Sequence, residues 1–351
     1  MKTVVTVSGI RPDFIRMSEI FKKLDNNFNH ILIHSGQHFD KLLSDVFFEE
    51  LDIRKPDYNL GIGGVGKEHF HQSSELAIKL IELLRYQKID PDIILFLGDS
   101  NSVTVSVPLK KEGYKIGHIE AGMRSYDRRM LEEINRVVCD HCSDLLFVYH
   151  ENYKNKAIKE GISEDNIFVV GNTIVEVVKK LKFEGRSKRD RILLDIHRPE
   201  NFNHKERLKT IVELGNRLSE SYGIPIKMLS FKRTMKKLKE FDIDLGNIEV
   251  VDLMSFKKYT KEVFHSKFII SDSGTAQEEP ALLGTPVIVP RDYTERPESV
   301  ENNCSMMFDV ENNRWDVVEA WLHLNCYKSD VKWMGEGKTS DKIIQILKNR
   351  L

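Results

Sequence analysis

The chain has 351 residues, and at roughly 150 residues per domain this length predicts two domains, each large enough to bury a hydrophobic core. Lys plus Arg number 53 and Asp plus Glu number 54, so the formal net charge of −1 excludes a general attraction to nucleic acid or acidic lipid. No apolar run approaches the roughly 20 residues of a membrane span, and four cysteines are too few for a disulfide framework. We therefore expect a cytoplasmic protein that binds neither membrane nor nucleic acid.

Short β-branched runs alternate with longer helical stretches in the first half of the chain. Strands are predicted over residues 3–7, 30–34, 93–97, 115–118, 145–148 and 167–170, and a first helix over about 12–24. The run at 93–97 contains no polar residue, as expected for a strand that is covered on both faces of a parallel sheet.

The polar segment 182–191 interrupts this pattern and is the predicted linker. A second series of strands follows over residues 192–196, 226–229, 248–251, 268–271 and 287–289. Strand–helix repeats connect by right-handed crossovers, which produce parallel sheets. The sequence thus predicts an α/β protein with two Rossmann-like, doubly wound domains, over residues 1–175 and 180–337. A C-terminal helix within 338–351 could close on either domain, including by packing back on the N-terminal one.

Polar or glycine-containing segments follow the predicted strands. In open parallel sheets, ligands bind beyond the carboxyl ends of the strands. Such segments occupy that position at residues 9–12, 35–38, 98–101, 120–122, 197–200, 273–275 and 291–292. Together they predict one active site in a cleft between the two domains.

Two of these segments suit a phosphate. Residues 272–279 are predicted to begin a helix, whose free amides bind anions, with Gly274 allowing close approach and Glu279 able to reach a ribose diol. An ordinary helix N-cap explains the same residues equally well. In the loop 291–298, arginines could clamp a pyrophosphate or pair with the loop's own acids on a solvated surface. Arg11 likewise is either a phosphate ligand or a surface charge.

Asp99, Glu120, Glu132 and His197 are the candidates for acid–base chemistry. Asp99 and Glu120 end neighbouring strands, so their carboxylates can approach each other and split their pKa values around neutrality. The alternatives are helix-dipole complementarity for Glu132 and a hydrogen-bonded structural role for His197. A metal site is disfavoured and none is expected, because no HxH, HExxH or DxD spacing is present.

Two further motifs are interpreted as structural. Cys139 and Cys142 lie in a helical run and have no second CxxC partner, so neither zinc nor redox chemistry is predicted. The glycine string at 61–66 follows no buried strand, and we expect a loop there and not a dinucleotide fingerprint.

Taken together, these segments resemble the UDP-N-acetylglucosamine 2-epimerase family over nearly the whole chain. The shared strings, in the family's order, are GIRP at 9–12, GQH at 36–38, GD at 98–99, HIEAGMR at 118–124, EEINR at 132–136, GNT at 171–173, HR at 197–198, DSG at 272–274, QEE at 277–279 and TERPE at 294–298. One string alone would mean little, whereas all of them in this order are specific.

The resemblance implies a fold of the glycosyltransferase-B type, with the nucleotide held mainly by the second domain. It implies that UDP is eliminated across C1–C2 of a small-molecule UDP-sugar to give a 2-acetamidoglycal, and is then added back with C2 inverted. No NAD and no metal are expected, since UDP itself is the leaving group. A homodimer is expected, because dimers are common in the family.

The matching positions imply acid–base roles for Asp99, Glu120 and Glu132, and leave open which carboxylate serves which face of C2. His197 is implied near the pyrophosphate or in assisting UDP departure. The residues implied or suggested to bind substrate or UDP are Arg11, Arg16, Gln37, His38, Arg124, Arg136, Asn172, Arg198, Glu200, Ser273, Gly274, Thr275, Glu279, Arg291, Thr294, Glu295 and Arg296.

The chain departs from the family's usual pattern at several positions. Arg16 stands where lysine is usual, Thr275 where a second glycine is usual, and Tyr293 where a small residue is usual. These departures bear on the sugar more than on the reaction. The alternatives are a C2-epimerase of a modified UDP-sugar (a 2,3-diacetamido-uronic acid or a 6-deoxy-L-hexosamine), a hydrolysing epimerase, a glycosyltransferase of the same fold, and a sugar-nucleotide sensor.

Overall fold

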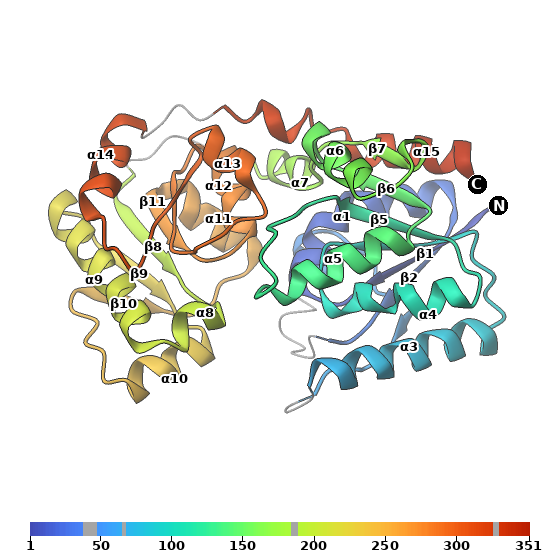
Figure 1. Ribbon diagram of the computed structural model, residues 1–351, viewed down its shortest axis with the longest axis horizontal. Coiled ribbons are helices and arrows are strands. Elements are labelled where there is room, and N and C mark those ends of the chain that lie inside the picture. Colours follow the sequence, from blue (N-terminus) through green and yellow to red (C-terminus); the bar gives the residue numbers. More distant parts are fainter. Residues whose placement is uncertain (38–47, 65–67, 184–188, 326–329) are drawn as a thin grey trace. The chain divides into compact units, whose positions relative to one another are not determined.

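The computed structural model describes residues 1–37, 48–64, 68–183, 189–325 and 330–351. The chain divides into two compact units (Figure 1). Unit 1 comprises Met1–Lys180 and Met334–Leu351, and unit 2 comprises Leu181–Trp333. None of the described helices is long and apolar enough to cross a membrane.

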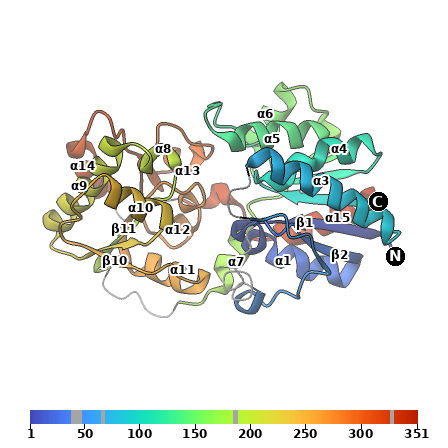
Figure 2. The same ribbon diagram turned by 90° about the horizontal axis from the view of Figure 1, so that it is seen from below.

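Unit 1 is built on a seven-stranded sheet of order β3-β2-β1-β4-β5-β6-β7, in which every pair of neighbours among the described strands is parallel. Its strands are β1 (Thr3–Ser8), β2 (Asn29–His34), β3 (Tyr58–Asn59), β4 (Ile93–Leu97), β5 (Ile116–Ala121), β6 (Leu145–Val148) and β7 (Ile167–Val169). Its helices are α1 (Arg11–Asn27), α3 (His69–Tyr86), α4 (Ser106–Lys111), α5 (Leu131–Cys142), α6 (Glu151–Lys159), α7 (Ile174–Lys180) and α15 (Thr339–Arg350). Figures 1 and 2 show α3, α4 and α5 on one face of this sheet and α1, α7 and α15 on the other.

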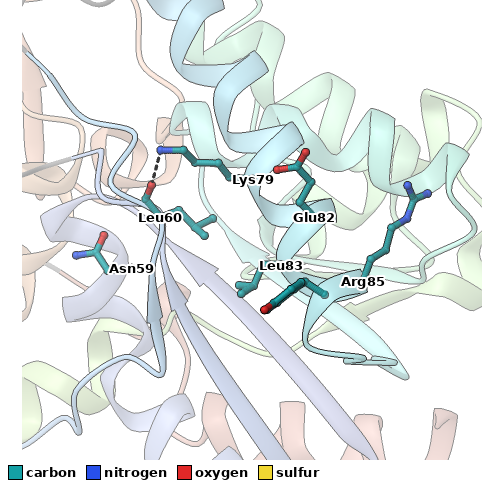
Figure 3. A pocket seen from close by; sticks show the side chains of 7 residues that line it. Asn59, Leu60, Lys79, Glu82, Leu83 and Arg85 are labelled. Carbon is teal, nitrogen blue, oxygen red and sulfur yellow. Dashed lines mark hydrogen bonds between the residues drawn. The ribbon is translucent and has the colours of Figure 1, made fainter.

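A surface groove of unit 1 lies beside β3 and α3 (Figure 3). It is lined by Asn59, Leu60, Lys79, Glu82, Leu83, Arg85 and Tyr86. Lys79 Nζ donates to the carbonyl of Leu60 at 2.9 Å and is paired with Glu75 at 2.7 Å. The groove contains none of the site residues predicted from the sequence.

Unit 2 repeats this architecture on a six-stranded parallel sheet of order β10-β9-β8-β11-β12-β13. Its strands are β8 (Arg191–Asp195), β9 (Ile226–Leu229), β10 (Ile248–Val251), β11 (Ser266–Ser271), β12 (Val287–Val289) and β13 (Ser305–Met307). Its helices are α8 (Pro199–Phe202), α9 (Lys205–Tyr222), α10 (Lys232–Glu240), α11 (Phe256–His265), α12 (Glu279–Leu282), α13 (Pro297–Glu301) and α14 (Trp315–Asn325).

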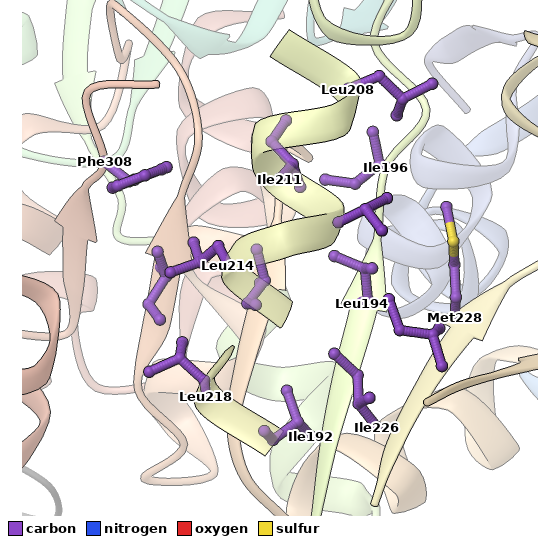
Figure 4. Close-up of a cluster of buried hydrophobic side chains, with 14 of the residues drawn as sticks. Ile192, Leu194, Ile196, Leu208, Ile211, Leu214, Leu218, Ile226, Met228 and Phe308 are labelled. Carbon is purple, nitrogen blue, oxygen red and sulfur yellow. The ribbon is translucent and has the colours of Figure 1, made fainter. Parts of the chain in front are cut away.

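The core of unit 2 lies on both faces of its sheet. Ile192 and Leu194 of β8, and Ile196 just after it, pack against α9, as Figure 4 shows, whereas Leu193 belongs to a second apolar cluster. Alternate residues of one strand thus serve opposite faces, as expected for a doubly wound sheet.

Both sheets have the same switch point in their strand order. In unit 1 the chain builds outward from β1 to β3 and then returns to the other side of β1 with β4; in unit 2 it does the same around β8 and β11. Ligands of open α/β sheets bind at the carboxyl ends of the strands at such a point. The loops after β1 and β4, and those after β8 and β11, are therefore the places to look for a site.

The strand predictions hold closely, with two differences, and one predicted helix is not found. The short edge strands β3 and β13 were not predicted. β5 continues to Ala121, so that Glu120 lies within the strand and not after it. The helix predicted to begin in 272–279 is wrong, because a 3₁₀ turn (Thr275–Gln277) precedes a helix of only four residues. So short a helix provides little macrodipole for an anion.

Candidate active site

Glu120 is held in an unusual backbone conformation at the end of β5. The pairing register of β5 with β6 shifts between Ile119 and Ala121, and Glu120 has a φ of 69°. Such a conformation is costly for a residue with a Cβ, and bulges of this kind re-aim a side chain. The side chain turns inward, where its carboxylate accepts hydrogen bonds from Arg16 Nη1 at 3.0 Å and from the Tyr149 hydroxyl at 3.2 Å. Glu120 is 3% exposed and fixed by donors from two different elements.

Asp99, directly after β4, is fixed by helix α5. Its carboxylate is paired with the buried guanidinium of Arg136, and Asn135 Nδ2 donates to its backbone carbonyl at 2.8 Å. Glu132, half-buried, lies one turn before Arg136 on the same face of α5. The structure thus brings Asp99 and Glu120 together at the ends of β4 and β5, and places Glu132 on the helix that holds Asp99.

Asp13 is a further carboxyl beside Asp99 and Glu120, and it was not predicted from the sequence. It lies in the first turn of α1 and accepts hydrogen bonds from the amides of Gly9 at 2.9 Å and Ile10 at 3.2 Å. Burial raises the pKa of Asp13 to about 7, with further contributions from the charges of Asp99 and Glu120. Its only signal in the sequence was an acid in the first turn of a predicted helix, which is common for capping alone.

Other predicted binding residues of unit 1 have structural contacts. Arg124 is buried and pairs with Asp140 at 2.7 Å and with Glu160 at 2.6 Å. Asn172 caps α7, since its Oδ1 accepts from the amide of Ile174 at 3.0 Å. The substrate contacts of Arg124 and Asn172 stay predictions.

Two predicted residues flank the ends of the first two strands. Arg11 is the first residue of α1 and is half-buried. The amide of Gln37, after β2, donates to Ser35 Oγ at 3.3 Å. The next residue, His38, lies outside the described residues.

His197 follows β8 in unit 2 and is held by two aspartates. Its Nδ1 lies 2.9 Å from Asp195 Oδ1, and its amide donates to Asp272 at 3.0 Å. Burial lowers the pKa of His197, but Asp195 and Asp272 outweigh it and the net shift is upward. His197 is therefore suited to carry a positive charge near an anionic ligand.

Asp195, His197 and Asp272 place three possible metal-ligating atoms within 4.8 Å of one another, among the residues the structure describes. His197 hydrogen-bonds to both aspartates, and Asp272 also accepts from the amide of Arg198 and from Asn201 Nδ2, each at 3.0 Å. These bonds account for the cluster without an ion.

The turn after β11 needs glycine at position 274. A Cβ on Gly274 would lie 2.4 Å from Glu295 Oε1 and 2.8 Å from Arg296 Nη1. On either side of it, the hydroxyls of Ser273 and Thr275 lie 3.1 Å apart. The segment thus presents two hydroxyls and a bare stretch of backbone beside the arginine loop.

The arginines of the loop after β12 are buried, so the loop is not a solvated surface, but they do pair with an acid of the loop itself, as the alternative expected. Arg291 pairs with Glu295 at 3.2 Å, and Arg296 pairs with Glu278 at 3.1 Å and with Glu295. The hydroxyl of Thr294 donates to Gln277 Oε1 at 2.8 Å. Buried guanidinium groups held by carboxylates are pre-oriented hydrogen-bond donors.

Tyr293 connects this loop to the segment after β8. Its hydroxyl donates to Glu200 Oε1 at 3.1 Å, and the guanidinium of Arg291 lies 4.9 Å from the centre of its ring. Glu200 is also 3.8 Å from Arg198 Nη1. Burial, followed by the charge of Glu200, raises the pKa of Tyr293 to about 12, which keeps it a neutral donor. Six of the predicted UDP-binding residues of unit 2 therefore form one network with Tyr293: Arg198, Glu200, Arg291, Thr294, Glu295 and Arg296.

Known proteins resemble the chain over its whole length. A family model described as UDP-N-acetylglucosamine 2-epimerase matches residues 22–348. The UDP-N-acetylglucosamine 2-epimerase of Methanocaldococcus jannaschii is 36% identical, over 97% of this chain and 97% of that one. The UDP-2,3-diacetamido-2,3-dideoxy-D-glucuronate 2-epimerase of Pseudomonas aeruginosa is 32% identical, over 98% of this chain and 99% of that one.

Solved structures of similar proteins lead to the same family. The M. jannaschii UDP-GlcNAc 2-epimerase in complex with UDP-GlcNAc and UDP has a TM-score of 0.89 at 35% identity, covering 99% of this chain and 100% of that chain. A glycotransferase of kitacinnamycin, at 12% identity and a TM-score of 0.59, shares the fold alone. The two Rossmann-like units are thus of the glycosyltransferase-B type. The chain belongs to the UDP-N-acetylglucosamine 2-epimerase family and is an isomerase of the epimerase type.

Proposed function

We propose that this protein interconverts the C2 epimers of a UDP-2-acetamido sugar, with UDP-N-acetylglucosamine and UDP-N-acetylmannosamine as the first pair to test. The observation that carries the proposal is the carboxyl cluster of unit 1. Asp99 and Glu120 are each fixed by a buried arginine, and Asp13 lies beside them. Such a cluster suits removal of a proton from carbon and its return, because the carboxyls are pre-oriented.

In the proposed reaction the C2–H bond breaks and its proton passes to a carboxylate of the cluster. The electron pair of that bond forms the C1=C2 double bond of a 2-acetamidoglycal, and the C1–O bond breaks with its pair leaving on UDP. Re-addition reverses these steps, with the proton delivered to the other face of C2. Asp13 can hold a proton near neutral pH, because burial raises its pKa to about 7.

Unit 2 is proposed to bind the UDP. The hydroxyls of Ser273 and Thr275 and the guanidinium groups of Arg291 and Arg296 would contact the pyrophosphate, whose charge grows as C1–O breaks. His197, with its pKa raised, would add a positive charge there. The reaction is proposed to need neither NAD nor metal, because UDP leaves and returns without oxidation.

A second candidate substrate is a UDP-2,3-diacetamido-uronic acid. The similarity to the P. aeruginosa 2-epimerase, at 32% identity over nearly the whole chain, favours it. Tyr293 in the arginine loop and Arg16 beside Glu120 are departures that could accommodate a different sugar. These positions should therefore influence which sugar is accepted.

Proton NMR with candidate UDP-sugars in D₂O, without acceptor or metal, tests the function. Deuterium at C2 of both epimers, with UDP still attached, would support reversible epimerisation and identify the sugar. Free N-acetylmannosamine with UDP would indicate a hydrolysing enzyme, and turnover only with an acceptor would indicate a transferase. Asp99→Asn should abolish exchange while UDP binding persists; full activity in this variant would contradict the assigned chemistry.

We also propose that the protein acts as a homodimer in the cytoplasm, since dimers are common in the family. Light scattering during gel filtration measures the mass directly. A monomeric mass at assay concentration would refute the dimer and leave the proposed reaction unaffected.

A further inference from the structure

A buried histidine connects the strands and the helix that carry the acid–base residues. His118 lies in β5, two residues before Glu120, and is fully buried. Its Nε2 lies 2.8 Å from the carbonyl oxygen of Gly98, whose peptide group leads into Asp99. Its Nδ1 lies 2.6 Å from Asp140 Oδ1. Both ring nitrogens therefore face acceptors.

Asp140 extends this connection into α5 and the loop after β5. Its second oxygen accepts from the amide of Gly122 at 3.0 Å and pairs with Arg124 at 2.7 Å. Asp140 lies on α5, the helix that also carries Glu132 and holds Asp99 through Arg136. The imidazole of His118, in β5, thus contacts both the residue after β4 and helix α5.

The surroundings of the ring favour two ring protons. A neutral imidazole has one N–H, so it could satisfy only one of its two acceptors, whereas the imidazolium donates to both. Burial alone disfavours the charge, but the carboxylate of Asp140, in contact with Nδ1, outweighs it and places the pKa of His118 well above its ordinary value. Arg124 faces Asp140 and not the ring.

We propose that His118, as a permanent imidazolium, is a positioning residue that holds Asp99, Glu120 and Glu132 in their mutual arrangement. It touches no substrate in this role, and it acts through the carbonyl of Gly98 and the carboxylate of Asp140. The inference rests on the proposed function for its catalytic consequence, but the charge of the ring can be tested without it.

The first experiment follows the ring nitrogens of ¹⁵N-histidine-labelled wild-type protein by NMR, with the His118 signals assigned by their loss in His118→Gln or His118→Asn. The imidazolium pattern with both N–H protons should persist from pH 6 to pH 9. A neutral ring, or a titration midpoint near the ordinary value of about 6.5, would overturn the proposal.

The second experiment separates the two contacts of the ring. A Gln amide nitrogen falls near the position of Nε2 and can retain the bond to Gly98, whereas an Asn amide nitrogen falls near Nδ1 and retains only the bond to Asp140. We expect His118→Asn to lower kcat about 100-fold with KM little changed, and His118→Gln to retain more activity. UDP affinity in calorimetry should match wild type for both.

His30→Gln is the matched control. His30 is also buried, and its Nδ1 lies 2.6 Å from Asp25 Oδ1. It is near the amino end of β2, whereas the acid–base residues lie at the carboxyl ends of their strands. This variant should lose stability and keep kcat. A folded His118→Asn with wild-type kcat, or a kcat loss in His30→Gln as large as in His118→Asn, would refute the positioning role. Inactive wild-type enzyme with every UDP-sugar would refute the proposed function instead, and the NMR result would still decide the charge of the ring.

Discussion

The carboxyls of the cluster differ in the hydrogen-bond donors and charges that surround them. Glu120 has two hydrogen-bond donors at defined distances, whereas Asp13 accepts from two backbone amides and faces two other carboxyls. Burial raises the pKa of Asp13, and this has a measurable effect on stability.

Asp13→Asn should remove a pH-dependent loss of stability. Burial raises the pKa of Asp13 from 3.8 to about 7, so between these values the unfolded chain has released a proton that the folded chain still holds. The contribution of this carboxyl is thus fully present below about pH 4 and is lost by about 1.4 kcal/mol per pH unit as the pH rises toward 7.

Urea unfolding of wild type and Asp13→Asn at several pH values checks this. The free energy of unfolding of Asp13→Asn, relative to that of the wild type, should increase steadily between about pH 4 and pH 7. The control is Asp316→Asn, at an exposed carboxyl whose pKa its ion pair with Arg314 lowers to about 2, and it should show no such trend between pH 5 and 7. Parallel curves for Asp13→Asn and wild type would contradict the raised pKa.

Arg291→Lys should weaken UDP binding. Lysine keeps the charge beside Glu295 but cannot donate two parallel hydrogen bonds to a phosphate. The affinity for UDP in calorimetry should fall roughly tenfold, about 1.4 kcal/mol. Arg314→Lys, at an exposed ion pair with Asp316, is the matched control and should bind UDP as the wild type does. Unchanged affinity in Arg291→Lys would remove this residue from the site.

At the scale of elements, the turn after β11 illustrates what sequence reasoning could and could not reach. The strand before it and the importance of Gly274 were predicted, but a regular helix after it was not found. The reason is local: Pro280 lacks the amide hydrogen that a helix running on from residue 275 would need at this position. The helix therefore starts afresh at Glu279, with Pro280 in its first turn, where no amide hydrogen is required. The bulge at Glu120 was also invisible, because it depends on register with a neighbouring strand.

Gly274→Ala tests the packing of this turn. The added methyl would meet Glu295 and Arg296, both buried, so one of the ion pairs of the arginine loop must shift. We expect a loss of about 1–3 kcal/mol in stability and weaker UDP binding. Thermal unfolding and calorimetry measure the two effects, and wild-type values in both would show that the loop relaxes freely.

For the whole molecule, the fold class, family and reaction type were predictable because short polar strings recur in order after buried strands, and the comparisons confirm all three. Asp13 was missed because an acid in the first turn of a helix has an ordinary explanation. Tyr149 was missed because its contact with Glu120 depends on how the residue just after β6 packs against the end of β5, which no sequence pattern marks. The roles of the individual site residues stay predictions.

Helix α15 should be necessary for the stability of unit 1. Ile343, Ile344 and Leu347 are buried, and the amide of Ser340 donates to Glu176 of α7 at 2.9 Å. Leu347→Ala should lower the free energy of unfolding by about 2–5 kcal/mol. Urea unfolding followed by probes in each unit should show the loss in unit 1, whereas Lys348→Ala, at the exposed neighbouring position, should behave as wild type. An unchanged unfolding transition of unit 1 in Leu347→Ala would contradict this.

The return of residues 334–351 to unit 1 also sets an order of events during synthesis. Unit 2 is continuous in the chain, from Leu181 to Trp333, so all of it is made before the ribosome reaches α15. Unit 1 lacks α15 until residues 339–350 have left the ribosome, and the buried face of α1 has no α15 to cover it during that interval. Unit 2 can therefore complete its fold on the nascent chain, while unit 1, although its sheet is translated first, is the last to be finished.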